Sequence, residues 1–159
     1  MRYLALSLSL SLFAAAATAQ DIAPRTGWTV AHSTKTHEQL VADVRSAIKE
    51  SGLIVVTQAG PTKAAAKRGI EIPGNLVIGA FNNDYAVRVL ETSTPAMIEA
   101  PIRFYVTENA DQTATLSYKT PSFVFAPYMD TAAPGLSEIA AELDGVFAAI
   151  AESAIASSQ

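Results

Sequence analysis

Two alternating segments joined by a short polar turn constrain the fold more than any other feature of this chain. Residues 102–107 alternate apolar with polar or amphipathic side chains, and residues 114–118 do the same after a polar turn at 109–112. Successive side chains of a β-strand point to opposite faces, so each segment has one apolar and one polar face. We therefore predict an antiparallel hairpin whose apolar face is buried and whose polar face meets water or a second subunit.

Two longer segments have the periodicity of amphipathic helices. Thr36 and Gln39 match a capping box, and apolar residues follow at helical spacing as far as Gly52, which suits a left-handed C-terminal cap. This pattern predicts a helix over about residues 37–51. Residues 136–150 predict a second helix, whose polar face carries acidic residues and no basic partner: Glu138, Glu142, Asp144 and Glu152.

The remaining elements are shorter. Strands are predicted at residues 28–33, 53–57 and 76–81, and the last two are expected to be buried. Short helices are predicted at residues 64–68 and from a cap at Asn83 or Asp84 to about Leu90. Helices on one face of a mainly antiparallel sheet make the expected fold a two-layer α+β domain, which covers residues 20–159.

The first 19 residues predict a cleavable signal peptide. Arg2 precedes an apolar run from Leu4 to Ala17, and Ala17-Thr18-Ala19 has the small residues that signal peptidase reads. The run is shorter than the 20 or so residues that a membrane-spanning helix needs. We therefore expect a periplasmic protein that begins at Gln20 and has no membrane insertion after cleavage.

The charge balance disfavours nucleic acid as a partner. The chain has 15 acidic and 11 basic residues, and a mildly acidic protein is poorly suited to bind a phosphate backbone. Lys63, Lys67 and Arg68 lie on or beside one short predicted helix. They could form an anion-binding patch, but a solvated helix face is the favoured interpretation.

The usual signatures of catalysis are missing from the sequence. The chain has no cysteine, no Gly-x-Ser-x-Gly, no His-Glu-x-x-His and no phosphate-binding glycine loop. An acid–base pair of Glu71 with Asp84 or Glu99 stays open, which would make a carboxylate-based hydrolase. A non-catalytic role is favoured, and no cofactor is expected.

An aromatic and proline-rich segment, residues 118–129, is the main candidate for a binding surface. The predicted ligand-binding residues come from this segment and from the turn after the third strand: Phe81, Asn82, Tyr118, Phe123, Phe125 and Tyr128. The leading hypothesis is a homodimeric module that binds a small apolar or amphipathic ligand or a protein partner. The alternatives are a segment that covers the core and, for Asn82-Asn83-Asp84, ordinary helix capping.

The two histidines support a second hypothesis, a metal or haem carrier. His32 shares a strand face with Trp28 and Val30, where a partly buried imidazole is favoured over a metal ligand. His37 lies in the first turn of a helix and is expected to be solvated. A metal or haem site would use His32 with help from Met97, Met129 or Tyr128.

The order of these elements resembles a bacterial family called domain of unknown function 302 (DUF302). The resemblance rests on the helix over residues 37–51 with Gly52–Val56 behind it, Ala64–Ala66 before Gly69, Leu76–Ile78 before Asn82, Ala100-Pro101-Ile102, and Tyr118–Pro121. It covers nearly all of the chain after residue 19. The resemblance implies a compact α+β fold, often dimeric, with no agreed activity.

This chain departs from the family pattern at two places. Members of the family often carry an Asp-His pair where the second strand meets the short helix, and Gly60 and Pro61 stand there in this chain. Neither residue can titrate or bind a metal. The Gly-Asn-Pro turn of the family is replaced by Phe81-Asn82-Asn83, so that only Asn82 carries over.

Overall fold

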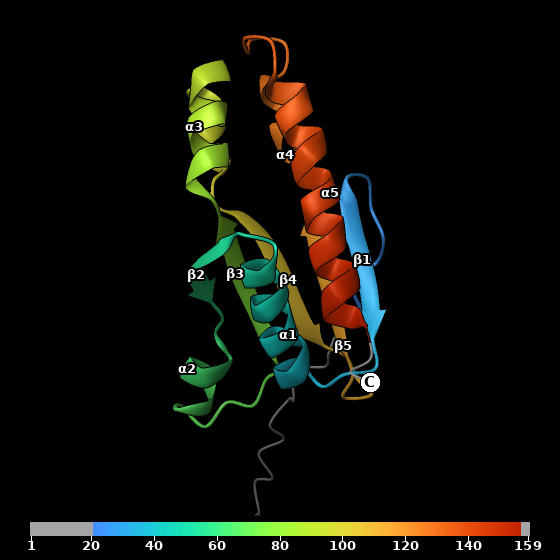
Figure 1. The fold of residues 1–159 in the computed structure, drawn as a ribbon. Coiled ribbons are helices and arrows are strands. Elements are labelled where there is room, and N and C mark those ends of the chain that lie inside the picture. Colours follow the sequence, from blue (N-terminus) through green and yellow to red (C-terminus); the bar gives the residue numbers. More distant parts are fainter. Residues whose placement is uncertain (1–20, 157–159) are drawn as a thin grey trace, which may run out of the picture.

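A five-stranded antiparallel sheet forms one layer of the computed structural model, which describes residues 21–156 (Figure 1). The predicted signal peptide lies outside the described residues. The strands, in their order across the sheet, are β1 (Trp28–Ser33), β5 (Ala114–Lys119), β4 (Ile102–Glu108), β3 (Asn75–Phe81) and β2 (Ile54–Ala59). The predicted hairpin is β4 and β5, and it lies in the middle of the sheet beside β3.

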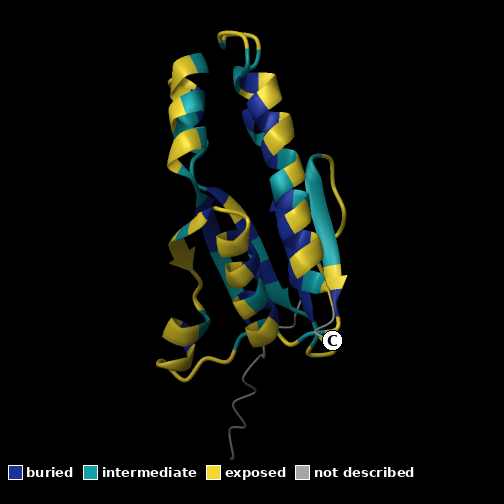
Figure 2. Ribbon diagram, viewed as in Figure 1, coloured by how far each residue is buried: buried dark blue, intermediate teal, exposed yellow. Residues whose placement is uncertain are grey.

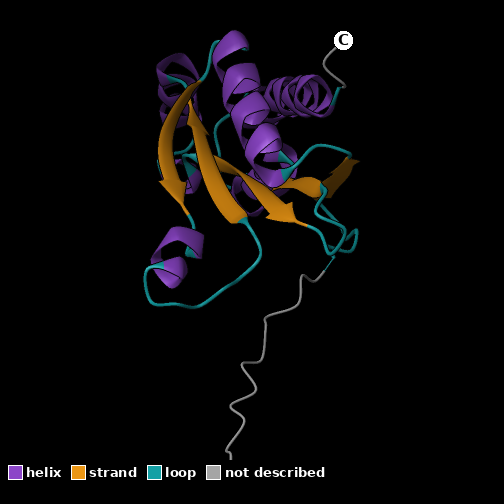
Figure 3. Ribbon diagram, turned by 90° about the horizontal axis from the view of Figure 1, so that it is seen from below, coloured by secondary structure: helices purple, strands orange, loops and turns teal. Residues whose placement is uncertain are grey.

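The second layer consists of helices, of which the two longest cover one face of the sheet (Figure 3). The α-helices are α1 (His37–Glu50), α2 (Thr62–Ala66), α3 (Asn83–Thr92), α4 (Pro121–Phe125) and α5 (Leu136–Ile155), and the 3₁₀ helices are η1 (Pro95–Glu99) and η2 (Ala126–Tyr128). The two longest, α1 and α5, pack on each other and on the same side of the sheet (Figure 3). This arrangement confirms the predicted two-layer α+β fold. Within residues 21–156, no helix has the length and apolar character that a membrane crossing would require.

The core lies between the sheet and these two helices (Figure 2). Phe104 of β4 stacks on Phe147 of α5 with ring centroids 4.5 Å apart, and Tyr118 of β5 meets the Phe104 ring edge-on at 5.2 Å. Aromatic pairs at such distances contribute beyond the area that they bury. All three side chains are at most 5% exposed, so this cluster anchors α5 to the hairpin.

The caps of α1 are those that the sequence predicts. The Thr36 hydroxyl accepts a hydrogen bond from the Gln39 amide, and the Gln39 side chain accepts one from the Thr36 amide. Gly52 follows the helix with a φ of +77°, a conformation that L side chains rarely adopt. Short-range polar spacing was therefore sufficient to place both ends of this helix.

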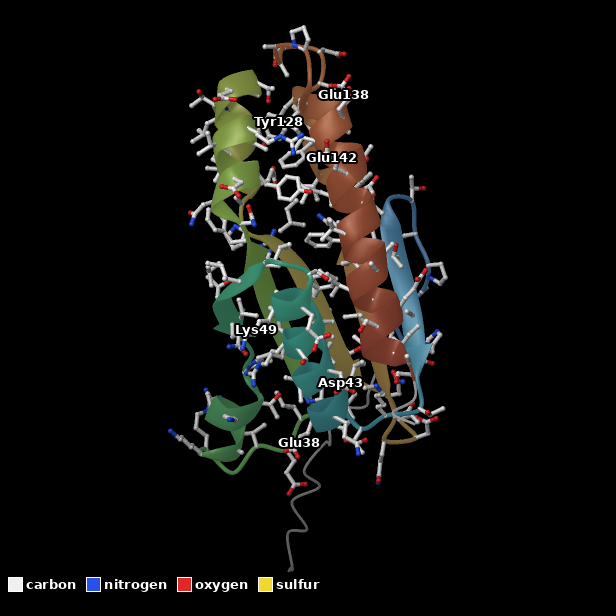
Figure 4. All side chains as sticks on the ribbon, viewed as in Figure 1. Glu38, Asp43, Lys49, Tyr128, Glu138 and Glu142 are labelled. Carbon is white, nitrogen blue, oxygen red and sulfur yellow. The ribbon has the colours of Figure 1, made fainter. Side chains whose placement is uncertain are left out.

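Four local predictions were wrong. β2 is an exposed edge strand with a register shift at Val56, because a β-branched run alone cannot distinguish an edge from a buried strand. Residues 121–128, expected to be irregular, form two short helices. The cap of α3 is Asn82, and the helix extends to Thr92. Glu142 on α5 has a basic partner after all, since Arg88 of α3 forms a two-pronged ion pair with it (Figure 4).

Lys35 lies in the loop just before α1 and links this loop to α1 and to the end of α5. Lys35 donates to the Asp43 carboxylate at 2.6 Å and to the Ala154 carbonyl at 2.8 Å, near the C-terminus of α5. The Lys35 side chain is only 12% exposed, so water screens this pair less than a surface pair. The ammonium also neutralises the partial negative charge of the last turn of α5.

Replacing this lysine tests its structural role. Lys35→Met is expected to lower the free energy of unfolding by about 1–3 kcal/mol, because it removes two hydrogen bonds to a charged donor. Lys49→Met, at an exposed position in the last turn of α1, is the control and should change stability by less than about 0.5 kcal/mol. Urea denaturation of both variants measures the difference, and equal losses would contradict the assignment.

Candidate ligand-binding site

The aromatic segment is held against α5 by polar contacts. The Thr120 hydroxyl caps α4 by accepting from the Phe123 amide, and Asp144 of α5 accepts from both the amide and the hydroxyl of Ser122. The sequence offers Asp144 no basic partner on the polar face of α5, and its carboxylate bonds to Ser122 instead. The contacts place α4 between two concave regions, because Phe125 lines one of them and Val124 the other.

The first region is a narrow apolar cleft that gathers three of the six predicted site residues. Phe81, Asn82 and Phe125 line it together with residues of α3, η1 and α5, among them Tyr85, Val89, Met97, Leu143 and Phe147. Its volume is about 40 Å³. An apolar cavity of about 150 Å³ is needed to hold benzene. The cleft is therefore too small for an organic ligand in this conformation.

The Asn82 side chain forms three hydrogen bonds with backbone groups around it. Its side-chain oxygen accepts from the amides of Asp84 and Tyr85 at 2.8 and 3.1 Å, and its nitrogen donates to the Gly52 carbonyl at 3.0 Å. These bonds cap α3 and tie its start to the turn after α1. The abrupt polar cluster after β3 therefore has a structural explanation.

The other three predicted site residues do not line this cleft, although Tyr118 contributes to the second region described below. Tyr118 is in the core, where burial raises the pKa of its hydroxyl. Phe123 is 41% exposed and its ring covers Gly27, where an added Cβ would lie 2.1 Å from ring carbons. Tyr128 donates to the Glu99 carboxylate at 2.8 Å, and this bond raises the pKa of Tyr128 (Figure 4). The structure does not bring the six residues into one site.

The second region is a larger depression on the sheet face that α1 and α5 leave uncovered, hereafter the open-face depression. Its volume is about 210 Å³, enough for a single substituted ring by the same comparison. The lining residues come from β1, β3, β4, β5, η1 and α4: Trp28, Val77, Glu99, Ile102, Arg103, Tyr105, Ser117, Tyr118, Lys119 and Val124. Glu99 links it to the aromatic segment through the bond from Tyr128.

The register of the strands explains the hollow. Ser117 of β5 lies between Val30 of β1 and Tyr105 of β4, and Tyr105 pairs with Val77 of β3. These side chains share the uncovered face because they alternate with core residues. Ser117 is 0% exposed, so its larger neighbours close over it and the depression lies above this row of side chains. The Ser117 Oγ is buried and has no hydrogen-bond partner within residues 21–156.

Cationic side chains surround the aromatic wall of the depression. The Lys119 ammonium lies 5.8 Å from the centroid of the Trp28 ring, and the Arg25 guanidinium lies 5.0 Å from it. Arg103 lines the depression from β4. Neither ion pair found among the described residues involves these three cations.

The two histidines lie elsewhere. His32 is exposed rather than partly buried, and its Nδ1 lies 3.0 Å from the Thr115 hydroxyl. That hydroxyl donates to Asn109, so the neutral His32 ring donates from Nδ1 and keeps its lone pair on Nε2. His37 is not solvated as expected: it packs against Gly74, and its Nε2 is buried without a partner. Within the described residues, no three His, Cys, Asp or Glu side chains are grouped to hold a metal ion.

The suggested carboxylate pairs are excluded by the length of β3. Glu71 precedes this seven-residue strand, whereas Asp84 follows it. A strand of that length separates its ends by about 20 Å. Glu99 precedes β4, whose start pairs with the end of β3, so it too lies far from Glu71. None of these pairs can act together as acid and base on one bond.

The local structure also explains why Gly60 stands where members of the family often carry an Asp-His pair. A Cβ at Gly60 would lie 2.3 Å from the carbonyl oxygen of Asn75, and Pro61 starts α2 directly afterwards. The backbones of β2 and β3 approach too closely here for a side chain such as aspartate. The family's polar pair therefore has no counterpart at this position.

Of the residues that line the open-face depression, only Tyr118 was among the predicted ligand-binding residues. The alternation of the hairpin correctly predicted that Arg103, Tyr105 and Ser117 share the outward face, but the predicted segment ended before Lys119. It could not predict that β1 adds Trp28 and that β3 adds Val77, because strand order is not encoded in local periodicity. A buried serine between large outward neighbours was the available signal, but it can be recognised only when the register is known.

Two substitutions separate the capping bonds of Asn82 from its bond to Gly52. Asn82→Ala is expected to lower the free energy of unfolding by about 1–2 kcal/mol, because it removes the cap of α3. Asn82→Asp keeps the capping oxygen and should recover more than half of that loss. Thermal and urea denaturation measure both variants. A stable Asn82→Ala variant would show that the cap is dispensable.

Comparisons with known proteins agree on the family. The family model "Domain of unknown function DUF302" matches residues 28–154. A crystal structure titled "uncharacterized conserved protein DUF302 from Bacillus stearothermophilus" superposes with a TM-score of 0.71 at 18% sequence identity, and the match covers 82% of this chain and 99% of that one. No curated protein matches the sequence. At this identity the structural likeness shows the fold, and the family model extends from β1 to the last turn of α5. The chain therefore belongs to the DUF302 family.

Proposed function

We propose that this chain is a non-catalytic module that binds a small amphipathic ligand in the open-face depression. The observation that carries the proposal is the Ser117 hydroxyl, which is buried at the base of the depression without a hydrogen-bond partner. A buried unpaired polar group costs stability, about 1–3 kcal/mol by mutational measurements. Ser117 is 0% exposed, so a ligand that displaces the side chains covering it and bonds to this hydroxyl would offset that cost.

The shape and composition of the depression support the same role. Small-molecule sites are concave, mostly apolar, and contain a few polar groups that orient the ligand. Here Trp28, Val77 and Tyr105 supply the apolar wall, while Ser117 and the cations supply polar contacts. Of the lining residues only Glu99 is acidic, and Tyr128 already engages its carboxylate, so a general acid–base pair is missing from the lining.

Export and self-association complete the proposal. Residues 1–19 have the pattern of a signal peptide, which supports export of the binding module to the periplasm. The uncovered sheet face also offers a surface for a second copy of the chain or another protein. A ligand site and a dimer interface on one face are compatible, since ligand sites often lie between subunits or domains.

The effect of Ser117 on stability and on binding tests the proposed site. Ser117→Ala is expected to leave the free energy of unfolding unchanged or to raise it by up to about 1 kcal/mol, because no bond is lost and an unpaired group is removed. The same variant should bind a monocyclic ligand about 3–10 times more weakly if the hydroxyl bonds to it. Trp28 is the only tryptophan of the chain, so quenching of its fluorescence reports occupancy of the depression.

Thr115→Val is the matched control for this test. Thr115 is buried on the same strand and the same face, but its hydroxyl bonds to His32 and Asn109. Losing these bonds should cost about 1–2 kcal/mol of stability and leave quenching by 3-phenylpropionate or its neutral amide unchanged. The proposal is wrong if neither probe quenches Trp28 saturably, or if Ser117→Ala behaves like Thr115→Val.

Native mass spectrometry of the untagged, full-length gene product tests the rest of the proposal. The expected result is a chain that begins at Gln20, recovered from the periplasm as a dimer. A retained mass that disappears on mild heating would give the ligand directly. An uncleaved chain would contradict export, and a monomer at all concentrations would contradict self-association.

A further inference from the structure

We infer that the ligand of the open-face depression is a monocyclic or similarly small organic carboxylate, held by its anionic group between Arg103 and Lys119. This inference rests on the proposed function, because it names the chemical class that the same depression would bind. It is carried by the relative positions of the two cations, which the strand register determines.

Arg103 and Lys119 line the same depression from neighbouring strands, one residue beyond the last paired residues of β4 and β5. Phe104 pairs with Tyr118 in the antiparallel register of β4 and β5, so the next pair outward along the ladder is Arg103 with Lys119. Both side chains point to the uncovered face, because their neighbours Phe104 and Tyr118 point into the core. Directly opposed residues have Cβ atoms about 4.5–5.5 Å apart, and like charges at such positions are destabilising.

The surrounding residues do not neutralise this pair of positive charges. No carboxylate of the described residues lies within ion-pair distance of either side chain, and Arg25 adds a third cation beside Trp28. Glu99, whose carboxylate accepts a bond from Tyr128, is the one acidic lining residue and offsets only part of the charge of the two lining cations. The local excess of positive charge contrasts with the chain as a whole, whose net charge is −4.

A carboxylate with an apolar body satisfies each of these features. The guanidinium can donate two parallel hydrogen bonds to a carboxylate, and the Lys119 ammonium can add a third. The apolar body would lie against Trp28, Val77 and Tyr105, within the 210 Å³ of the depression. The Ser117 hydroxyl would then bond to a polar atom of the ligand. An inorganic anion would engage the cations and leave the aromatic wall unused.

Three matched probes test the charge preference by quenching of Trp28. They are 3-phenylpropionate, its neutral amide, and 3-phenylpropylamine, which share one ring and one chain length. The carboxylate is expected to bind about 10 to 100 times more tightly than the amide, since a charge-assisted contact is worth about 1.5–3 kcal/mol, and the amine should bind most weakly. Added salt should weaken the binding of the carboxylate and leave the binding of the amide unchanged, because salt screens the attraction between exposed charges.

Variants that remove one positive charge test whether Arg103 and Lys119 cause the preference for the carboxylate. Arg103→Gln and Lys119→Gln should each reduce the carboxylate-to-amide ratio about tenfold and leave the affinity for the amide unchanged. Both variants should also be as stable as the wild type or more stable, because each relieves a like-charge pair. Lys67→Gln, an equal charge loss at the exposed C-terminal end of α2, is the control and should keep the wild-type ratio.

The possible results separate this inference from the proposed function. Equal saturable binding of all three probes would overturn the carboxylate preference and leave the binding module standing. Tight binding of phosphate alone, without the phenyl probes, would also overturn it. Failure of every probe to quench Trp28 would overturn both.

Discussion

The packing of Phe104 and Tyr118 against Phe147 is the constraint on which the rest of the structure depends. These rings attach the longest helix to the central hairpin. They also determine which face each remaining residue of β4 and β5 occupies, because side chains alternate along a strand. Slippage by one residue would bury Arg103 and Lys119 and expose the aromatic core. The register of the open face is therefore maintained by the core on the other side of the sheet.

The open face contains features that reduce the stability of the protein alone. A serine hydroxyl lies buried without a partner among residues 21–156, and two like charges from neighbouring strands line the same depression. Proteins tolerate such costs at functional sites, where a ligand or partner compensates for them. The aromatic core and the Lys35 contacts supply stability elsewhere. This division between a stabilising face and a destabilising face is the physical basis of the proposed function.

The aromatic segment after β5 has a different role from the one that its composition suggests. Its two short helices divide the small apolar cleft from the open-face depression, and its polar anchors reach Asp144 and Glu99. Phe125 and Tyr118 are core residues, whereas Tyr128 positions a carboxylate at the depression. The aromatic segment borders both concave regions, but composition cannot tell a residue that lines a cavity from one that supports it.

The sequence by itself determined the elements whose signals are local. The capping box at Thr36, the left-handed Gly52 and the alternation of β4 and β5 depend on residues within a few positions of each other, and all three appear in the structure. Only the tertiary structure decided that β2 lies at an edge, that Arg88 reaches Glu142, and that Trp28 and Val77 line one depression with Ser117. These contacts join residues far apart in the chain, and the order of strands that creates them results from packing of the whole sheet rather than from any local pattern.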